Sequence, residues 1–147
     1  MPVNNLAPLI ILATSIPAWP CQCASASPAT LLRSSDVVAE IVIAPIDSKS
    51  RYRRVTTILN VWKGNLQMGG LFYDSTSLLC TIPTTLEPGK PTIVYLHWVS
   101  AKDGGKPRLS TGLCARIVSE RFALVRERLV LDRVTKRLPA AVRNGRV

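Results

Sequence analysis

The chain has 147 residues, of which 47% are hydrophobic, and it carries a formal net charge of +10. This length fits one ordinary domain with a real core, and we expect no second domain. The sequence contains no repeats and no low-complexity tracts. A basic protein of this kind tends to meet polyanions, such as acidic polysaccharide, lipid head groups or stray nucleic acid.

Residues 1–20 form an apolar leader without a charged side chain. Its apolar run is too short to span a bilayer and too close to the N-terminus to be a core strand, so we interpret it as a secretory signal with cleavage near 18–20. A buried strand or an uncleaved anchor is the alternative. Cleavage after Ala18 leaves two residues before Cys21, whereas cleavage after Pro20 exposes Cys21. The sequence thus predicts a secreted or periplasmic (extracellular) protein, with no stable membrane span once the leader is removed.

Four cysteines follow the leader, namely Cys21, Cys23, Cys80 and Cys114. The oxidising space outside the cytoplasm favours disulfides, and four cysteines allow three pairings. Cys21 and Cys23 are alternate residues that point to opposite sides of an extended chain, so we expect each to bond a distant partner. A zinc site is the alternative, but it is poorly supported because the two downstream cysteines stand alone and the chain has one histidine.

A short helix is predicted over 28–35, with Pro28 at its first position. Five strands are predicted next, over 36–45, 52–62, 71–74, 92–99 and 108–114. Turn residues separate them at 47–51, 87–90 and 102–106. The strand over 36–45 is a nearly continuous β-branched run, which is typical of a strand buried on both faces. Five strands joined by antiparallel turn signals predict a mainly β fold, closed into a small barrel.

From Val118 to Pro139 the hydrophobic period is helical. The apolar face of this predicted helix consists of Val118, Phe122, Val125 and Leu129, extended by Leu131, Val134 and Leu138. We expect this face to pack on the barrel while the arginines of the helix point to solvent. Binding of this basic amphipathic helix to a membrane surface is the alternative. Residues 139–147 are predicted to be a disordered basic tail.

The positive charge also makes polyanion binding a candidate function. The candidate contacts are Arg51, Arg53, Arg54, Arg126 and Arg133. A basic surface that is simply solvated is the alternative. Nucleic acid is not an expected partner, because the aromatic residues are spread over three strands and are better explained by core packing than by base stacking. These aromatic residues are Trp62, Phe72, Tyr73, Tyr95 and Trp98.

Enzymatic activity is not predicted. His97 is the one histidine, and its place inside the strand over 92–99 indicates a partly buried structural role. No hydroxyl or thiol nucleophile stands at a recognisable spacing from a base and an orienting acid. Asp36 lies between a helix and a strand, where we expect it to accept hydrogen bonds from backbone amides.

Several short motifs occur in a characteristic order. They are Cys21-Gln22-Cys23, Pro28, Leu31-Leu32, Ser35-Asp36-Val37-Val38, Val61-Trp62-Lys63-Gly64, Cys80, Pro88-Gly89, Gly104-Gly105 and Cys114. Together they resemble the signature of the tissue inhibitors of metalloproteinases and of the wider netrin-like (NTR) domain family, over roughly residues 21–130. Arg33 stands where the animal inhibitors have the first cysteine of a third disulfide. The resemblance is therefore to the minimal, bacterial-type single domain.

The resemblance implies an OB-fold-like, five-stranded antiparallel barrel over 21–138, flanked by a short N-terminal helix and a C-terminal amphipathic helix. It also implies the disulfides Cys21–Cys80 and Cys23–Cys114. We expect no cofactor and no intrinsic metal.

In the animal inhibitors the mature N-terminal cysteine chelates the zinc of the target protease. The resemblance therefore implies that Cys21 chelates this zinc and that Gln22 enters the specificity pocket. The neighbouring ridge would consist of Ser77, Leu78 and Leu79. Chelation requires a free, unprotonated α-amine on Cys21, so a residue left before Cys21 would abolish it. The alternative is a non-inhibitory extracellular module that binds another exported protein or a polyanion.

Overall fold

The structure is a computed structural model that describes residues 26–45, 52–73, 86–100, 104–112 and 116–139. The helices in this part of the chain are α1 (Pro28–Ser34) and α2 (Arg121–Thr135). The strands are β1 (Val37–Ile43), β2 (Tyr52–Lys63), β3 (Leu71–Tyr73), β4 (Thr92–Val99), β5 (Arg108–Ser110) and β6 (Ile117–Val118). The fold is therefore mainly β, as the sequence predicts.

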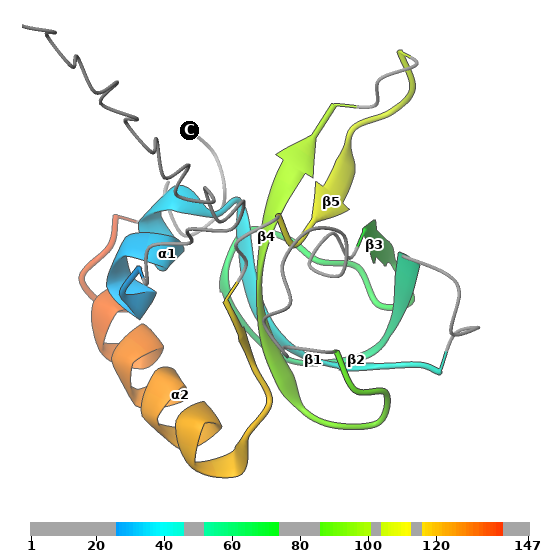
Figure 1. Ribbon diagram of the computed structural model, residues 1–147. Coiled ribbons are helices and arrows are strands. Elements are labelled where there is room, and N and C mark those ends of the chain that lie inside the picture. The colour runs from blue at the N-terminus through cyan, green and yellow to red at the C-terminus, as the bar shows by residue number, and fades with distance from the viewer. Residues whose placement is uncertain (1–25, 46–51, 74–85, 101–103, 113–115, 140–147) are drawn as a thin grey trace, which may run out of the picture.

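The sheet closes into a ring because β1 pairs with a strand on each of its sides (Figure 1). The order around the ring is β1, β2, β3, β5, β4 and back to β1. Strands β5 and β6 both pair with β4, but with different stretches of it. The β3–β5 pair is parallel. The expectation of a purely antiparallel sheet is therefore wrong at this junction, and β6 is a strand that the sequence did not predict.

Strand β1 is buried on both faces, which confirms the prediction from its β-branched run. Its side chains alternate between two cores, as the pleat requires. Val37, Ala39 and Ile41 belong to one core cluster, together with residues of β2, β3 and β5. Val38 belongs to a second cluster, which includes buried residues of α1 and α2. The two helices therefore cover one side of the ring, as Figure 1 shows.

Helix α1 starts where the sequence predicts. The Ser27 hydroxyl accepts a hydrogen bond from the Thr30 amide at 3.2 Å, and Pro28 occupies the first turn, where its missing N–H costs nothing. Leu32 is fully buried and is the main contact of this short helix with the core. The helix ends at Ser34, before the extended Ser35, and the chain enters β1.

Helix α2 begins later than predicted, because Val118 lies in β6. The Glu120 carboxylate caps the helix by accepting hydrogen bonds from the amides of Phe122 at 3.0 Å and Ala123 at 2.7 Å. These two bonds lower the pKa of Glu120 below its ordinary value. The cap fixes the start of α2 at Arg121, three residues after the predicted start.

The predicted apolar face of α2 is right for Leu131, Val134 and Leu138, which pack on the core, and wrong for its first half. Phe122, Val125 and Leu129 are 77%, 48% and 63% exposed, whereas the buried side chains of the helix are those of Leu124, Glu127 and Leu131. Compared with the predicted orientation, the helix is rotated about its axis, because polar side chains near its buried face hold it against the sheet. A hydrophobicity pattern counts these residues as solvent-facing, so it cannot detect this orientation.

Glu127 is the buried centre of these polar contacts. Its carboxylate accepts a hydrogen bond from the Tyr95 hydroxyl at 2.6 Å and two from the Arg116 guanidinium, at 2.7 and 2.9 Å. Burial and the bond to Glu127 raise the pKa of Tyr95 well above its ordinary value. A buried carboxylate is tolerated only with such partners. Glu127 thereby joins α2 to β4.

Two further polar contacts fix the same helix. The Trp62 indole donates to Asp132 Oδ1 at 2.6 Å. The Arg128 guanidinium donates to the buried Glu40 of β1, with Nε at 2.8 Å from Oε2. Together with Glu127, these contacts join α2 to three neighbouring strands, β1, β2 and β4.

Replacing Glu127 by Leu should lower the free energy of unfolding by about 1–3 kcal/mol, because the buried Tyr95 hydroxyl loses its acceptor. The double variant Glu127→Leu/Tyr95→Phe should be no less stable than Glu127→Leu alone, since it removes the unpaired hydroxyl. Urea unfolding of the single and double variants measures this coupling. Strictly additive losses would show that the two side chains act independently.

A second prediction concerns Gly64, which follows the last residue of β2 and has φ +74°. A Cβ at this position would lie 2.3 Å from the carbonyl oxygen of Asp36 and 2.9 Å from Val37 Cγ2, so β1 itself would have to move. Gly64→Ala should therefore lower the free energy of unfolding by about 3 kcal/mol or more. Gly89 is the matched control, since it has φ +79° with nothing near its missing Cβ.

Gly89→Ala should lose only the cost of the left-handed backbone, about 1–2 kcal/mol. Thermal and urea unfolding of both variants give the comparison. Equal losses at the two positions would mean that the contact with β1 contributes nothing.

Candidate binding site

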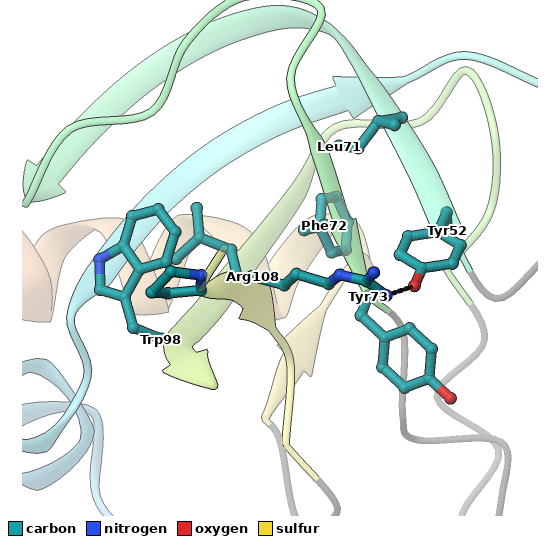
Figure 2. A pocket seen from close by; sticks show the side chains of 8 residues that line it. Tyr52, Leu71, Phe72, Tyr73, Trp98 and Arg108 are labelled. Carbon is teal, nitrogen blue, oxygen red and sulfur yellow. Dashed lines mark hydrogen bonds between the residues drawn. The ribbon is translucent and has the colours of Figure 1, made fainter. Parts of the chain in front are cut away.

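A partly open hollow of about 400 Å³ lies where β2 and β5 begin and β3 and β4 end (Figure 2). Its lining residues are Tyr52, Leu71, Phe72, Tyr73, Trp98, Pro107, Arg108 and Leu109. They come from four strands and from the residue before β5. The ring brings them together, because β3 pairs with both β2 and β5, and β5 pairs with β4.

Two tyrosines form one wall of the hollow. Tyr52 and Tyr73 are paired across β2 and β3, and their rings meet edge to face with centroids 5.2 Å apart. This geometry is the favourable one for aromatic pairs. The wall is therefore held in place before any ligand binds.

Arg108 is fixed against this wall. Its guanidinium carbon lies 5.7 Å from the centroid of the Tyr52 ring, and its Nη1 donates to the Tyr52 hydroxyl, as Figure 2 shows. A guanidinium has five N–H donors, and no carboxylate in the described ranges forms an ion pair with Arg108. Arg108 thus presents an oriented cation at the hollow.

Trp98 is 54% exposed, although it stands near the end of the buried strand β4. Its cross-strand partner is Leu109, which is buried. The expectation that Trp98 packs in the core is therefore wrong, whereas Trp62, Phe72 and Tyr95 are buried as expected. The exposed indole of Trp98 and the fixed guanidinium of Arg108 both line the hollow, and they give it an apolar surface and a charged donor.

The residues to which the family resemblance assigns inhibition and disulfide bonding lie outside the described residues. These are Cys21, Gln22, Cys23, Ser77, Leu78, Leu79, Cys80 and Cys114. The inhibitory segment and both disulfides therefore stay predictions, as do the leader over 1–20 and the tail from 140 onward. Within the described ranges, no group of three His, Cys, Asp or Glu side chains is arranged to hold a metal ion.

The candidate polyanion residues fall into two groups, apart from Arg51, which lies outside the described residues. Arg53 and Arg54 pair with Phe72 and Leu71 of β3, beside the hollow. Arg126 and Arg133 are exposed on α2. Trp62, which bonds α2, is nine residues along β2 from Arg53, or about 30 Å at the usual rise per residue. The four arginines thus lie on two different elements, β2 and α2.

Asp36 accepts a hydrogen bond from the Trp98 amide at 2.8 Å, which confirms the prediction that it caps backbone amides. Its carboxylate also lies 3.9 Å from His97 Nδ1, and the His97 side chain is partly buried. Nearby, Lys63 donates to the carbonyl oxygen of Arg33 at 2.9 Å. Desolvation lowers the pKa of Lys63, although the charge of Asp36 acts in the opposite direction. These bonds fasten the end of α1 and the start of β1 to β4 and β2.

Compared with known proteins, the chain matches no family model and no curated protein at a significant level. Among the described helices, none has the length and apolar character needed to cross a membrane.

Proposed function

We propose that this protein is an exported, disulfide-bonded domain of the netrin-like type that binds another protein through the hollow beside Trp98 and Arg108. The observation that carries the proposal is the combination of an exposed indole, a tyrosine wall and an oriented guanidinium at one site. Trp, Tyr and Arg are the residue types that dominate the binding energy of protein interfaces. Tyr52, Tyr73 and Arg108 hold one another in place, which lowers the entropy cost of binding.

The finer fold assignment is part of this proposal. We infer that the ring is an OB-type barrel, because five strands close it and α2 packs beside β2 and β6. OB-type barrels bind their ligands on the face of strands 2 and 3 and on the loops next to it. The hollow lies at the start of β2 and along β3, and it includes Pro107 before β5. Its position thus supports ligand binding, independently of its residue types.

The chemistry of the lining defines the expected ligand. Trp98, Leu71 and Pro107 offer apolar contact, and Arg108 offers donors to a carboxylate. A ligand that combines both features is an exposed segment of another protein in which a large apolar residue stands next to Asp or Glu. Oligosaccharide or nucleic acid would also stack on the aromatic residues. The predicted export argues against nucleic acid, and the position of Arg108 favours an acidic ligand.

Selection of peptides from a random library against the full chain tests this proposal. We expect enrichment of sequences with an aromatic or large aliphatic residue beside an acid. Trp98→Ala should weaken binding of these peptides at least about tenfold, since hot-spot truncations cost about 2 kcal/mol or more. Arg108→Lys, which keeps the charge and loses the planar fork, should weaken binding less.

Leu59 supplies the matched control, because it is an exposed apolar residue of β2 that does not line the hollow. Leu59→Ala should leave peptide affinity unchanged. Selected peptides that bind Trp98→Ala as tightly as the unchanged protein would refute the proposal. Binding of glycans or oligonucleotides, but not of peptides, would assign the hollow to a different ligand class.

Inhibition of a zinc metalloprotease is the second candidate, and one observation favours it. Strand β3, which lines the hollow, ends at Tyr73, only four residues before Ser77 of the expected inhibitory ridge. A protease held at Cys21 and Ser77 could then extend over the hollow. In this case the hollow would bind part of the target enzyme. If it does, both candidates use the same surface of the described fold.

The N-terminus decides the inhibitory candidate. Protein prepared to start at Cys21 should inhibit an extracellular zinc endopeptidase, and protein that keeps Pro20 should be at least about a hundredfold weaker, since the amine no longer reaches the zinc. Mass spectrometry of the mature chain from its host shows which form exists. Equal inhibition by both preparations, or inhibition by neither, would eliminate chelation through Cys21.

A further inference from the structure

Large apolar side chains lie on the outward side of α2. Phe122, Val125 and Leu129 recur at the spacing that places residues on one side of a helix, and all three are exposed. Figure 1 shows α2 on the opposite flank of the ring from β3. We define these three residues, with Arg126 and Arg133, as the outer α2 face. It lies across the ring from β3, which lines the hollow.

The outer α2 face carries positive charge that no acid among the described residues pairs with. Arg126 and Arg133 are exposed and interleave with Phe122 and Leu129 on the helix surface. The acids of this region are engaged elsewhere: Glu120 caps the helix, Glu127 binds Tyr95 and Arg116, and Asp132 accepts from Trp62. Within the described residues, Arg126 and Arg133 form no ion pair. Lys136 and Arg137 add further exposed charge at the end of the helix.

This pattern matches the chemistry of an anionic lipid surface. Helices that lie in a membrane interface insert aromatic and aliphatic side chains at the boundary between headgroups and acyl chains. Their arginines extend toward lipid phosphates, and each cation near the surface strengthens binding. A second copy of the chain is a poorer occupant, because two-fold symmetry would bring the same arginines together across the contact.

We propose that the outer α2 face docks this protein peripherally on an anionic membrane. Phe122 and Leu129 enter the interface, while Arg126 and Arg133 contact lipid phosphates. Helix α2 then lies along the membrane surface, with the ring on its other side. Because the hollow lies across the ring, it stays accessible in the docked protein.

Sedimentation of the full chain with vesicles tests the proposal. Vesicles of phosphatidylcholine with phosphatidylglycerol should bind the protein, and vesicles of phosphatidylcholine alone should bind it much less. Phe122→Ser/Leu129→Ser should reduce binding at least about tenfold, because it removes the inserting side chains. Met68→Ser is the matched control, since Met68 is 70% exposed and lies outside α2. It should bind vesicles as the unchanged protein does.

A second pair of measurements separates lipid from other polyanions. Phe122→Ser/Leu129→Ser keeps every charge, so its retention on heparin should equal that of the unchanged protein. Arg126→Gln/Arg133→Gln should weaken both vesicle and heparin binding and should reduce the salt dependence. Circular dichroism of each variant establishes that the fold is kept, since all four side chains are exposed.

Unchanged vesicle binding by Phe122→Ser/Leu129→Ser would overturn the proposal, because it would assign binding to another part of the chain, such as the leader. Equal binding to neutral and anionic vesicles would overturn it as well. Analytical ultracentrifugation covers the remaining case. If the unchanged protein forms a dimer and does not bind vesicles, and Phe122→Ser/Leu129→Ser is a monomer, the outer α2 face is a site of self-association.

Discussion

Every other part of the described fold depends on the pairing of β1 with two neighbours. The strand bonds β2 on one side and β4 on the other, and it contributes side chains to both core clusters. An open sheet would leave an edge that can pair with other chains, and here β1 closes that edge. The close approach of Gly64 to Asp36 shows how tightly the start of β1 is enclosed. The hollow exists because the same ring brings four strand ends together.

Polar contacts, rather than apolar area alone, decide how α2 sits on this ring. Glu127, Arg128 and Asp132 each bind a different strand of the sheet. A helix held by three such bonds has little freedom to rotate, so its apolar side chains on the far side stay in solvent. The arrangement fixes the orientation of the helix at the cost of exposed hydrophobic surface. Exposed hydrophobic side chains do not stabilise the fold, so contact with a binding partner explains them better.

The sequence predicts the strands well because their signal is local. β-Branched runs and glycine turns mark β1, β2 and β4 almost to their ends. The parallel β3–β5 pair, β6 and the orientation of α2 were not predicted, because each depends on partners distant in the sequence. The orientation of α2 depends on Glu40, which is 88 residues from Arg128. The hollow was missed for the same reason, and only the placement of Trp98 and Arg108 at strand ends beside a loop hinted at it.

The environments of Trp62 and Trp98 give this protein two optical reporters. Trp62 is buried and donates its indole N–H to Asp132, so its emission responds to whether α2 is seated on the sheet. Trp98 stands half in solvent at the hollow, where aqueous quenchers can reach it and a ligand would shield it. Differences in emission wavelength and in accessibility to quenchers therefore separate unseating of the helix from occupation of the hollow. A chain that starts at Cys21 lacks Trp19, the third tryptophan, so both events can be followed in it without a label.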